Sequence, residues 1–330
     1  MFPAGRADWR TAIFPLLMIS PRTFIAFAGG ITFAGALLAQ TTATSENNNT
    51  TEAAPSSVES AAPAEVVGPV NSMQVGTGFD YSRGSYGFAE DTEVFSVPLL
   101  LTYNVEKWVL RASVPYLKIK GPADAVGTTG ASGGGGSGSS SGLSGVVPGL
   151  PGSTSGGTTS ASTPARPVSN SESGIGDVML GATRMLGPVI GPVQVDLTAR
   201  VKLPTADEAK GLGTGETDYY AQADFYYAGQ TFIPFATLGY RFMTDSDLYA
   251  LENGAYASLG SAYRLTDTTR AGVSLDWRQK IVDGGDDATE VSVFVAHDFS
   301  PRWNLILYAL TGFTDASPDF GTGGSVSYRF

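Results

Sequence analysis

The feature that most constrains the fold is a period-two alternation of apolar and polar residues. In residues 193–203, VQVDLTARVKL, apolar side chains occupy every second position and polar ones lie between them. Side chains alternate between two faces in a strand but not in a helix, so this pattern predicts β-strands. We count about twelve such segments, at 73–81, 94–104, 107–117, 174–185, 192–203, 217–227, 231–242, 254–265, 268–280, 289–299, 302–313 and 319–330.

The connections between these segments alternate between short and long. Antiparallel barrels of the outer membrane have short periplasmic turns and long extracellular loops. The pattern therefore predicts an all-β fold, a transmembrane antiparallel up-and-down β-barrel of about twelve strands. Both termini of the barrel segment are expected on the periplasmic side. Short connections lie near residues 105–106, 187–191, 228–230, 266–267 and 300–301, and long ones at 82–93, 118–173, 204–216, 243–253, 281–288 and 314–318.

Aromatic residues collect at both ends of the apolar face, with Val, Leu and Ala between them. Two aromatic girdles around an aliphatic band match the two interfaces of a bilayer. The core of a soluble barrel or sandwich has no reason to sort its aromatic residues in this way. At the short-turn ends these residues are Tyr103, Trp108, Tyr227, Phe232, Tyr263, Phe299, Trp303, Tyr328 and Phe330, and at the long-loop ends they are Tyr81, Tyr116, Tyr219, Tyr240, Trp277, Phe313 and Phe320.

Two low-complexity tracts separate the chain into parts. Residues 1–39 read as a signal peptide, with Met18 as an alternative start; an uncleaved membrane anchor is the other interpretation. Residues 40–71 form a linker predicted to be disordered, and 72–330 form the barrel. The Gly/Ser-rich tract 121–173 is predicted to be a flexible extracellular loop.

Three stretches resemble a family of outer-membrane barrels that is named as transporters of the meta-pathway of phenol degradation. They are RASVPYLKIKG (111–121), SGIGDVMLGATRML (173–186) and VKLPTADEAKGLGTGETDYYAQADF (201–225). The resemblance covers about 72–330 and implies a barrel that passes small solutes, aromatic or hydrophobic ones among them. The Gly/Ser-rich insertion departs from the compact pattern of such barrels.

Assigning the apolar face to lipid places the polar face in the lumen. Its charges are expected either to set up a field across the pore, basic on one wall and acidic on another, or to pair and fill the lumen. The predicted lumen-lining charged residues are Asp80, Arg111, Asp177, Asp196, Arg200, Lys202, Asp224, Arg241, Arg264, Arg270, Asp276, Arg278, Lys280, Glu290 and Arg329.

Nearer the periplasm the inward face becomes less polar. Two interpretations are open: a slide for apolar or aromatic solutes, or plain side-chain packing that plugs this half. The predicted lumen-lining apolar and aromatic residues are Tyr220, Tyr226, Ile233, Phe235, Tyr256, Phe294, Ile306 and Tyr308.

Few residues suggest catalysis or the binding of a metal or phosphate. The chain has no Cys and a single His, His297, whose neighbours two positions away along the strand are Val295 and Phe299, with no hydroxyl. The acidic segment 282–290 lacks the spacing of an EF-hand, and the GTGETD motif lacks the Lys of a phosphate loop. We therefore expect no catalytic residues, no metal site and no cofactor.

The sequence thus predicts a passive outer-membrane channel for small solutes. The alternatives are a structural or adhesive surface barrel that displays residues 121–173, and an outer-membrane lipid-modifying enzyme. Expected partners are the lipid bilayer and lipopolysaccharide, the barrel-assembly machinery, for which Tyr328 and Phe330 form the predicted signal, and a small-molecule solute. The net charge of −11 argues against nucleic acid.

Overall fold

The structure is a computed structural model that describes residues 71–86, 91–121, 171–245, 251–281 and 285–330. The predicted signal peptide, nearly all of the linker and most of the Gly/Ser-rich tract lie outside these residues. Among the described residues, no helix is long and apolar enough to cross a bilayer.

Within the described residues, thirteen strands form one antiparallel sheet, with a single 3-10 turn, η1 (Glu208–Lys210), before β7. The strands are β1 (Ser72–Gly84), β2 (Thr92–Val105), β3 (Trp108–Lys120), β4 (Ser171–Ile175), β5 (Val178–Ile190), β6 (Val193–Leu203), β7 (Asp218–Tyr227), β8 (Phe232–Phe242), β9 (Gly254–Arg264), β10 (Thr269–Arg278), β11 (Ala288–Asp298), β12 (Trp303–Gly312) and β13 (Phe320–Arg329).

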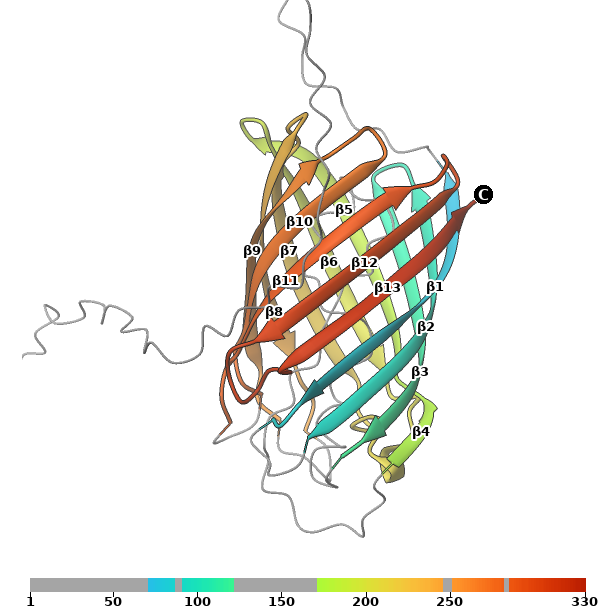
Figure 1. Cartoon of the computed structure of the whole chain (residues 1–330), viewed down its shortest axis with the longest axis vertical. Coiled ribbons are helices and arrows are strands. Elements are labelled where there is room, and N and C mark those ends of the chain that lie inside the picture. Colours follow the sequence, from blue (N-terminus) through green and yellow to red (C-terminus); the bar gives the residue numbers. More distant parts are fainter. Residues whose placement is uncertain (1–70, 87–90, 122–170, 246–250, 282–284) are drawn as a thin grey trace, which may run out of the picture. The chain divides into compact units, whose positions relative to one another are not determined.

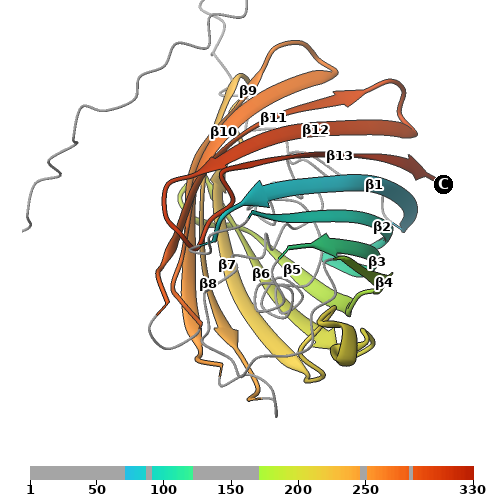
Figure 2. The same ribbon diagram turned by 60° about the horizontal axis from the view of Figure 1, so that its bottom comes forward.

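The sheet closes on itself, because β13 pairs with β1 from Gln74↔Arg329 to Arg83↔Phe320. Apart from β4 and β5, which both pair with β3, the strands pair with their neighbours in sequence, which gives the up-and-down ring seen in Figures 1 and 2. A closed ring leaves no unpaired sheet edge, the condition for a β-structure within lipid. The predicted barrel and its closure by the last strand are confirmed.

One predicted strand is in fact two. The segment expected at 174–185 is divided into β4 and β5, and both pair with β3, so the thirteen strands occupy twelve positions in the ring. The register of β3 shifts by one residue between Tyr116↔Ile175 and Ser113↔Met179. Asp177 lies at this bulge, in the gap between the end of β4 and the start of β5.

The outward face carries the aromatic girdles as predicted. The side chains of Trp108, Phe232, Tyr263 and Trp303 are exposed at the short-turn end, and those of Tyr116, Tyr219, Phe313 and Phe320 at the long-loop end. The inward face holds most of the buried residues, which include many polar side chains and an apolar cluster from β7, β8, β9, β11 and β12.

Candidate functional site: the barrel lumen

A row of register partners carries three arginines along the lumen wall. It runs from Arg111 on β3 through Gly181 and Arg200 to Tyr220 on β7. From Tyr220 it continues to Arg241 on β8 and Gly254 on β9. The glycines make room for their neighbours: a Cβ on Gly181 would lie 3.1 Å from Cγ of Arg200, and one on Gly254 would lie 3.2 Å from Nη2 of Arg241.

Arg200, Tyr220, Gln222, Arg241 and Tyr256 form what we call the arginine–tyrosine cluster. Nη2 of Arg200 donates hydrogen bonds to Oε1 of Gln222 (2.8 Å) and to the Tyr256 hydroxyl (3.1 Å). The Tyr256 hydroxyl in turn donates to Oε1 of Gln222 (2.8 Å). The Arg200 guanidinium also lies 5.7 Å from the centroid of the Tyr220 ring.

A second row, of acidic and hydroxyl residues, lies nearer the periplasm. Its register partners are Asp196, Asp224, Thr237, Ser258, Asp276 and Glu290. Asp224 accepts hydrogen bonds from Gln222 (2.7 and 2.9 Å) and Thr237 (2.7 Å), and Asp276 accepts them from Ser258 (2.6 Å) and Ser274 (2.8 Å). Two of the four carboxylates in this row are thus held by neutral donors.

The lumen charges do not separate into a basic and an acidic wall. Arg278 pairs with Glu290 on the adjacent strand, and Arg270 lies 3.7 Å from Asp298. The ion pairs also do not span the lumen, because they join neighbouring strands. Alternating basic and acidic rows replace the transverse arrangement considered from the sequence.

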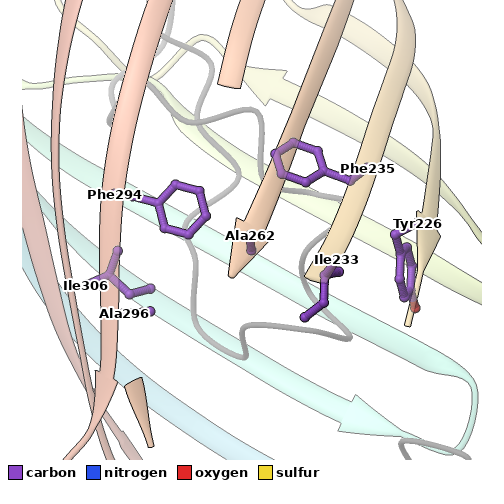
Figure 3. Packing of buried hydrophobic residues seen from close by; sticks show 7 residues of the cluster. All are labelled: Tyr226, Ile233, Phe235, Ala262, Phe294, Ala296 and Ile306. Atoms are coloured by element: carbon purple, nitrogen blue, oxygen red, sulfur yellow. The ribbon is translucent and has the colours of Figure 1, made fainter. Parts of the chain in front are cut away.

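The inner half of the lumen carries an apolar cluster. Its side chains point inward from β7, β8, β9, β11 and β12 (Figure 3). Tyr308 packs against the cluster and bonds to Asp80. Tyr220 and Tyr256, grouped with these residues from the sequence, instead lie higher, among the arginines. The members are Tyr226, Ile233, Phe235, Ala262, Phe294, Ala296 and Ile306.

Four large lumen rings each lie over a glycine at the directly paired position of the next strand. A Cβ on Gly239 would lie 2.1 Å from Tyr256, one on Gly260 2.4 Å from Phe235, and one on Gly272 2.3 Å from Phe294. Tyr308 lies over Gly323 in the same way. The rings therefore lie along the wall of the barrel.

Lys202, expected to line the lumen, is instead fully buried under the β6–β7 loop. Its Nζ lies 2.5 Å from Oδ2 of Asp218 and 3.5 Å from Oδ2 of Asp177, and it donates to Oγ1 of Thr214 at 2.7 Å. Asp177 also accepts hydrogen bonds from the backbone N–H groups of residues 205 and 206, at 3.1 and 3.0 Å. We call these four residues (Asp177, Lys202, Thr214 and Asp218) the loop latch, because they join the strand break to the loop.

Two loop residues that the sequence did not single out reach into the mouth of the lumen. Leu212 of the β6–β7 loop is fully buried against the inward side chains of Leu117 and Ile119 on β3. Tyr86 of the β1–β2 loop is also buried, and this burial raises the pKa of its phenol. In the sequence, only the glycines on either side of Leu212 in GLGTG mark this position. Loop residues carry no periodicity that would indicate burial.

The remaining predicted residues lie at the rims. Arg264 and Arg329 face inward near the short-turn ends of β9 and β13, and Lys280 follows the end of β10. The outward His297 has a hydroxyl partner that the sequence analysis did not identify: its Nδ1 lies 2.8 Å from Oγ1 of Thr269 on the paired strand. Among the described residues, no group of three or more His, Cys, Asp or Glu could hold a metal ion.

These features define an outer-membrane β-barrel, and comparison with solved structures agrees. An outer-membrane channel from Pseudomonas putida F1 matches with a TM-score of 0.54 and 15% identity, over 82% of this chain and 99% of that one. The CymD monoaromatic hydrocarbon channel matches at 0.38 and 15%, over 79% and 88%, and the KdgM porin at 0.41 and 8%, over 77% and 99%. The closed barrel and its apolar belt place the protein in the bacterial outer membrane.

The sequence identifies the particular family within this class. A family model described as the MetA-pathway of phenol degradation matches residues 105–330, and the chain belongs to that family. No curated protein sequence matches the chain.

Proposed function

We propose that the protein is a passive channel that admits small solutes, aromatic or hydrophobic ones among them. The observation that carries this proposal is the inner half of the lumen, where rings from several strands lie over paired glycines along the wall. Such a lining offers a solute many weak contacts, which favour entry without trapping it. The fold shared with the P. putida F1 outer-membrane channel and the family's link to phenol degradation support it.

Conductance in planar bilayers tests this proposal. The refolded barrel should carry a steady KCl current, and so should a variant in which a short turn replaces residues 122–170. If both forms migrate as folded barrels on a gel but neither carries a current, the proposed channel function is wrong.

A lipid-modifying enzyme is the second candidate, and the pair of Thr269 and His297 favours it. A hydroxyl beside an imidazole at the lipid face is the beginning of a nucleophile–base arrangement. Among the contacts of the described residues, however, no carboxylate orients the imidazole. Hydrolysis of phospholipid vesicles by the wild type, lost in both His297→Ala and Thr269→Val, would favour this activity. Equal background rates in all three proteins would exclude it.

A surface barrel that displays residues 121–173 is the third candidate. It predicts that deletion of 122–170 abolishes binding of cells to a surface or partner while KCl current is absent from both forms. A current that persists in the deleted form would favour the channel instead.

A further inference from the structure

Two arginines in the outer half of the lumen have no carboxylate partner. Lys202, Arg270 and Arg278 each lie within 4.0 Å of a carboxylate, but Arg200 and Arg241 form no such ion pair with any described residue. Arg200 bonds to neutral oxygens of Gln222 and Tyr256, and Arg241 donates to the backbone carbonyl of Gln279. A half-buried guanidinium that only neutral oxygens hold can bind an anion directly, so this arrangement suits an anion.

The nearest acidic residues bind other groups, so neither guanidinium is bound directly by a carboxylate of the described residues. Asp218, next to Tyr220 on the inward face of β7, binds Lys202. Asp224 receives its hydrogen bonds from Gln222 and Thr237. Across the lumen face, Asp276 is held by serines and Glu290 by Arg278.

Each arginine also has one nitrogen that donates no hydrogen bond to a described residue. The Nε of Arg200 and the Nε of Arg241 are buried and have no hydrogen-bond partner among the described residues. A guanidinium that offers Nε and a terminal nitrogen together can bind a carboxylate or sulfonate through two parallel hydrogen bonds. Register pairing sets the two guanidiniums on either side of Tyr220.

Aromatic surface is present at the same level. Tyr220 lies between the two arginines in the register, and the Tyr256 ring is turned across Gly239 until its hydroxyl reaches Gln222. A planar ring stacks well on tyrosine rings and on a guanidinium plane. An aliphatic anion would use only half of this arrangement.

We propose that the arginine–tyrosine cluster is a binding subsite for an aromatic monoanion, a planar ring that carries one carboxylate-type or sulfonate group. The anionic group binds Arg200 and Arg241, and the ring contacts Tyr220 and Tyr256. The apolar cluster further along β7 and β8 then receives the ring. This proposal rests on the proposed channel function, because the solute reaches the subsite through the lumen.

Block of the KCl current tests the subsite with three permanently charged probes. Benzenesulfonate combines a ring with an anion, methanesulfonate lacks the ring, and phenyltrimethylammonium reverses the charge. In the wild-type barrel, benzenesulfonate should reduce the current at a lower concentration than either of the other two. Calorimetric titration of the barrel in detergent with each of the three probes should show the same order of affinity.

The double variant Arg200→Gln, Arg241→Gln should raise the half-blocking concentration of benzenesulfonate by about tenfold, the factor that corresponds to one charge-assisted hydrogen bond. The matched control Arg329→Gln removes a lumen arginine near the periplasmic end and should leave that concentration unchanged. If the glutamine variant does not fold, the charge-conserving variant Arg200→Lys, Arg241→Lys replaces it. Benzenesulfonate should block this variant more weakly than the wild type, but still better than phenyltrimethylammonium does.

The possible failures are distinguishable. If the wild-type barrel carries no KCl current, the channel itself is overturned, and the subsite with it. If the barrel conducts but benzenesulfonate blocks no better than methanesulfonate, or equally well in the glutamine variant, only the subsite is overturned. Stronger block by phenyltrimethylammonium would show that the lumen selects cations.

Discussion

Lys202 is the residue on which the mouth of the barrel most depends, because one buried ammonium group faces two buried carboxylates. We expect Lys202→Met to lower the free energy of unfolding by about 3–5 kcal/mol, since Asp177 and Asp218 would remain buried without a counter-charge. Urea unfolding in lipid vesicles measures this loss. The triple variant Lys202→Met, Asp177→Asn, Asp218→Asn should recover most of it, and a triple variant as unstable as the single one would contradict the charge explanation.

Gly239 determines where the Tyr256 ring lies, because a Cβ at this position would lie 2.1 Å from that ring. We expect Gly239→Ala to destabilise the barrel by about 1–3 kcal/mol, the usual cost of overpacking. In a Tyr256→Ala background the same substitution should cost much less. A double-mutant cycle measures the difference, and additive effects would show that the ring and the glycine act independently.

At the scale of elements, the seam between β13 and β1 closes the barrel. The N–H of Phe330 donates to the carbonyl of Met73 at 2.8 Å, and the rings of Tyr328 and Phe330 meet edge to face with centroids 5.0 Å apart. Removal of residues 328–330 should lower the fraction of protein that folds into vesicles, because the seam loses its periplasmic end. Heat-modifiable gel mobility measures that fraction. The double substitution Thr266→Ala, Asp267→Ala in another periplasmic turn is the control, and an equal loss there would argue against a special role for the seam.

At the scale of the whole molecule, the barrel is continuous on either side of residues 122–170. Lys120 at the end of β3 pairs with Ser171 at the start of β4. A two-residue Asn-Gly turn in place of residues 121–170 should therefore join the strands and change the melting temperature by only a few degrees. Circular dichroism on heating measures the melting temperature of both forms. Failure of the shortened chain to fold would show that the tract stabilises the barrel.

Much of this architecture could be predicted from the sequence, and the exceptions share a cause. Period-two alternation reports which face a residue occupies, so the inward position of Arg200, Phe235 and Phe294 followed from parity alone. The bulge at Asp177 shifts the parity by one residue without changing the composition of the segment, and the alternation on both sides hid it. Leu212 and Tyr86 lie in loops, where no period indicates direction.

The sequence by itself determined that the chain forms a closed barrel with a lipid-facing side, because alternation, turn length and aromatic girdles are local properties of each strand. Only the tertiary structure decided which lumen residues meet. Strand register places Arg200, Tyr220 and Arg241 in one row and sets four other lumen rings over glycines of the next strands. Register and loop position depend on contacts between segments distant in sequence, and a single strand carries no record of its neighbour's alignment.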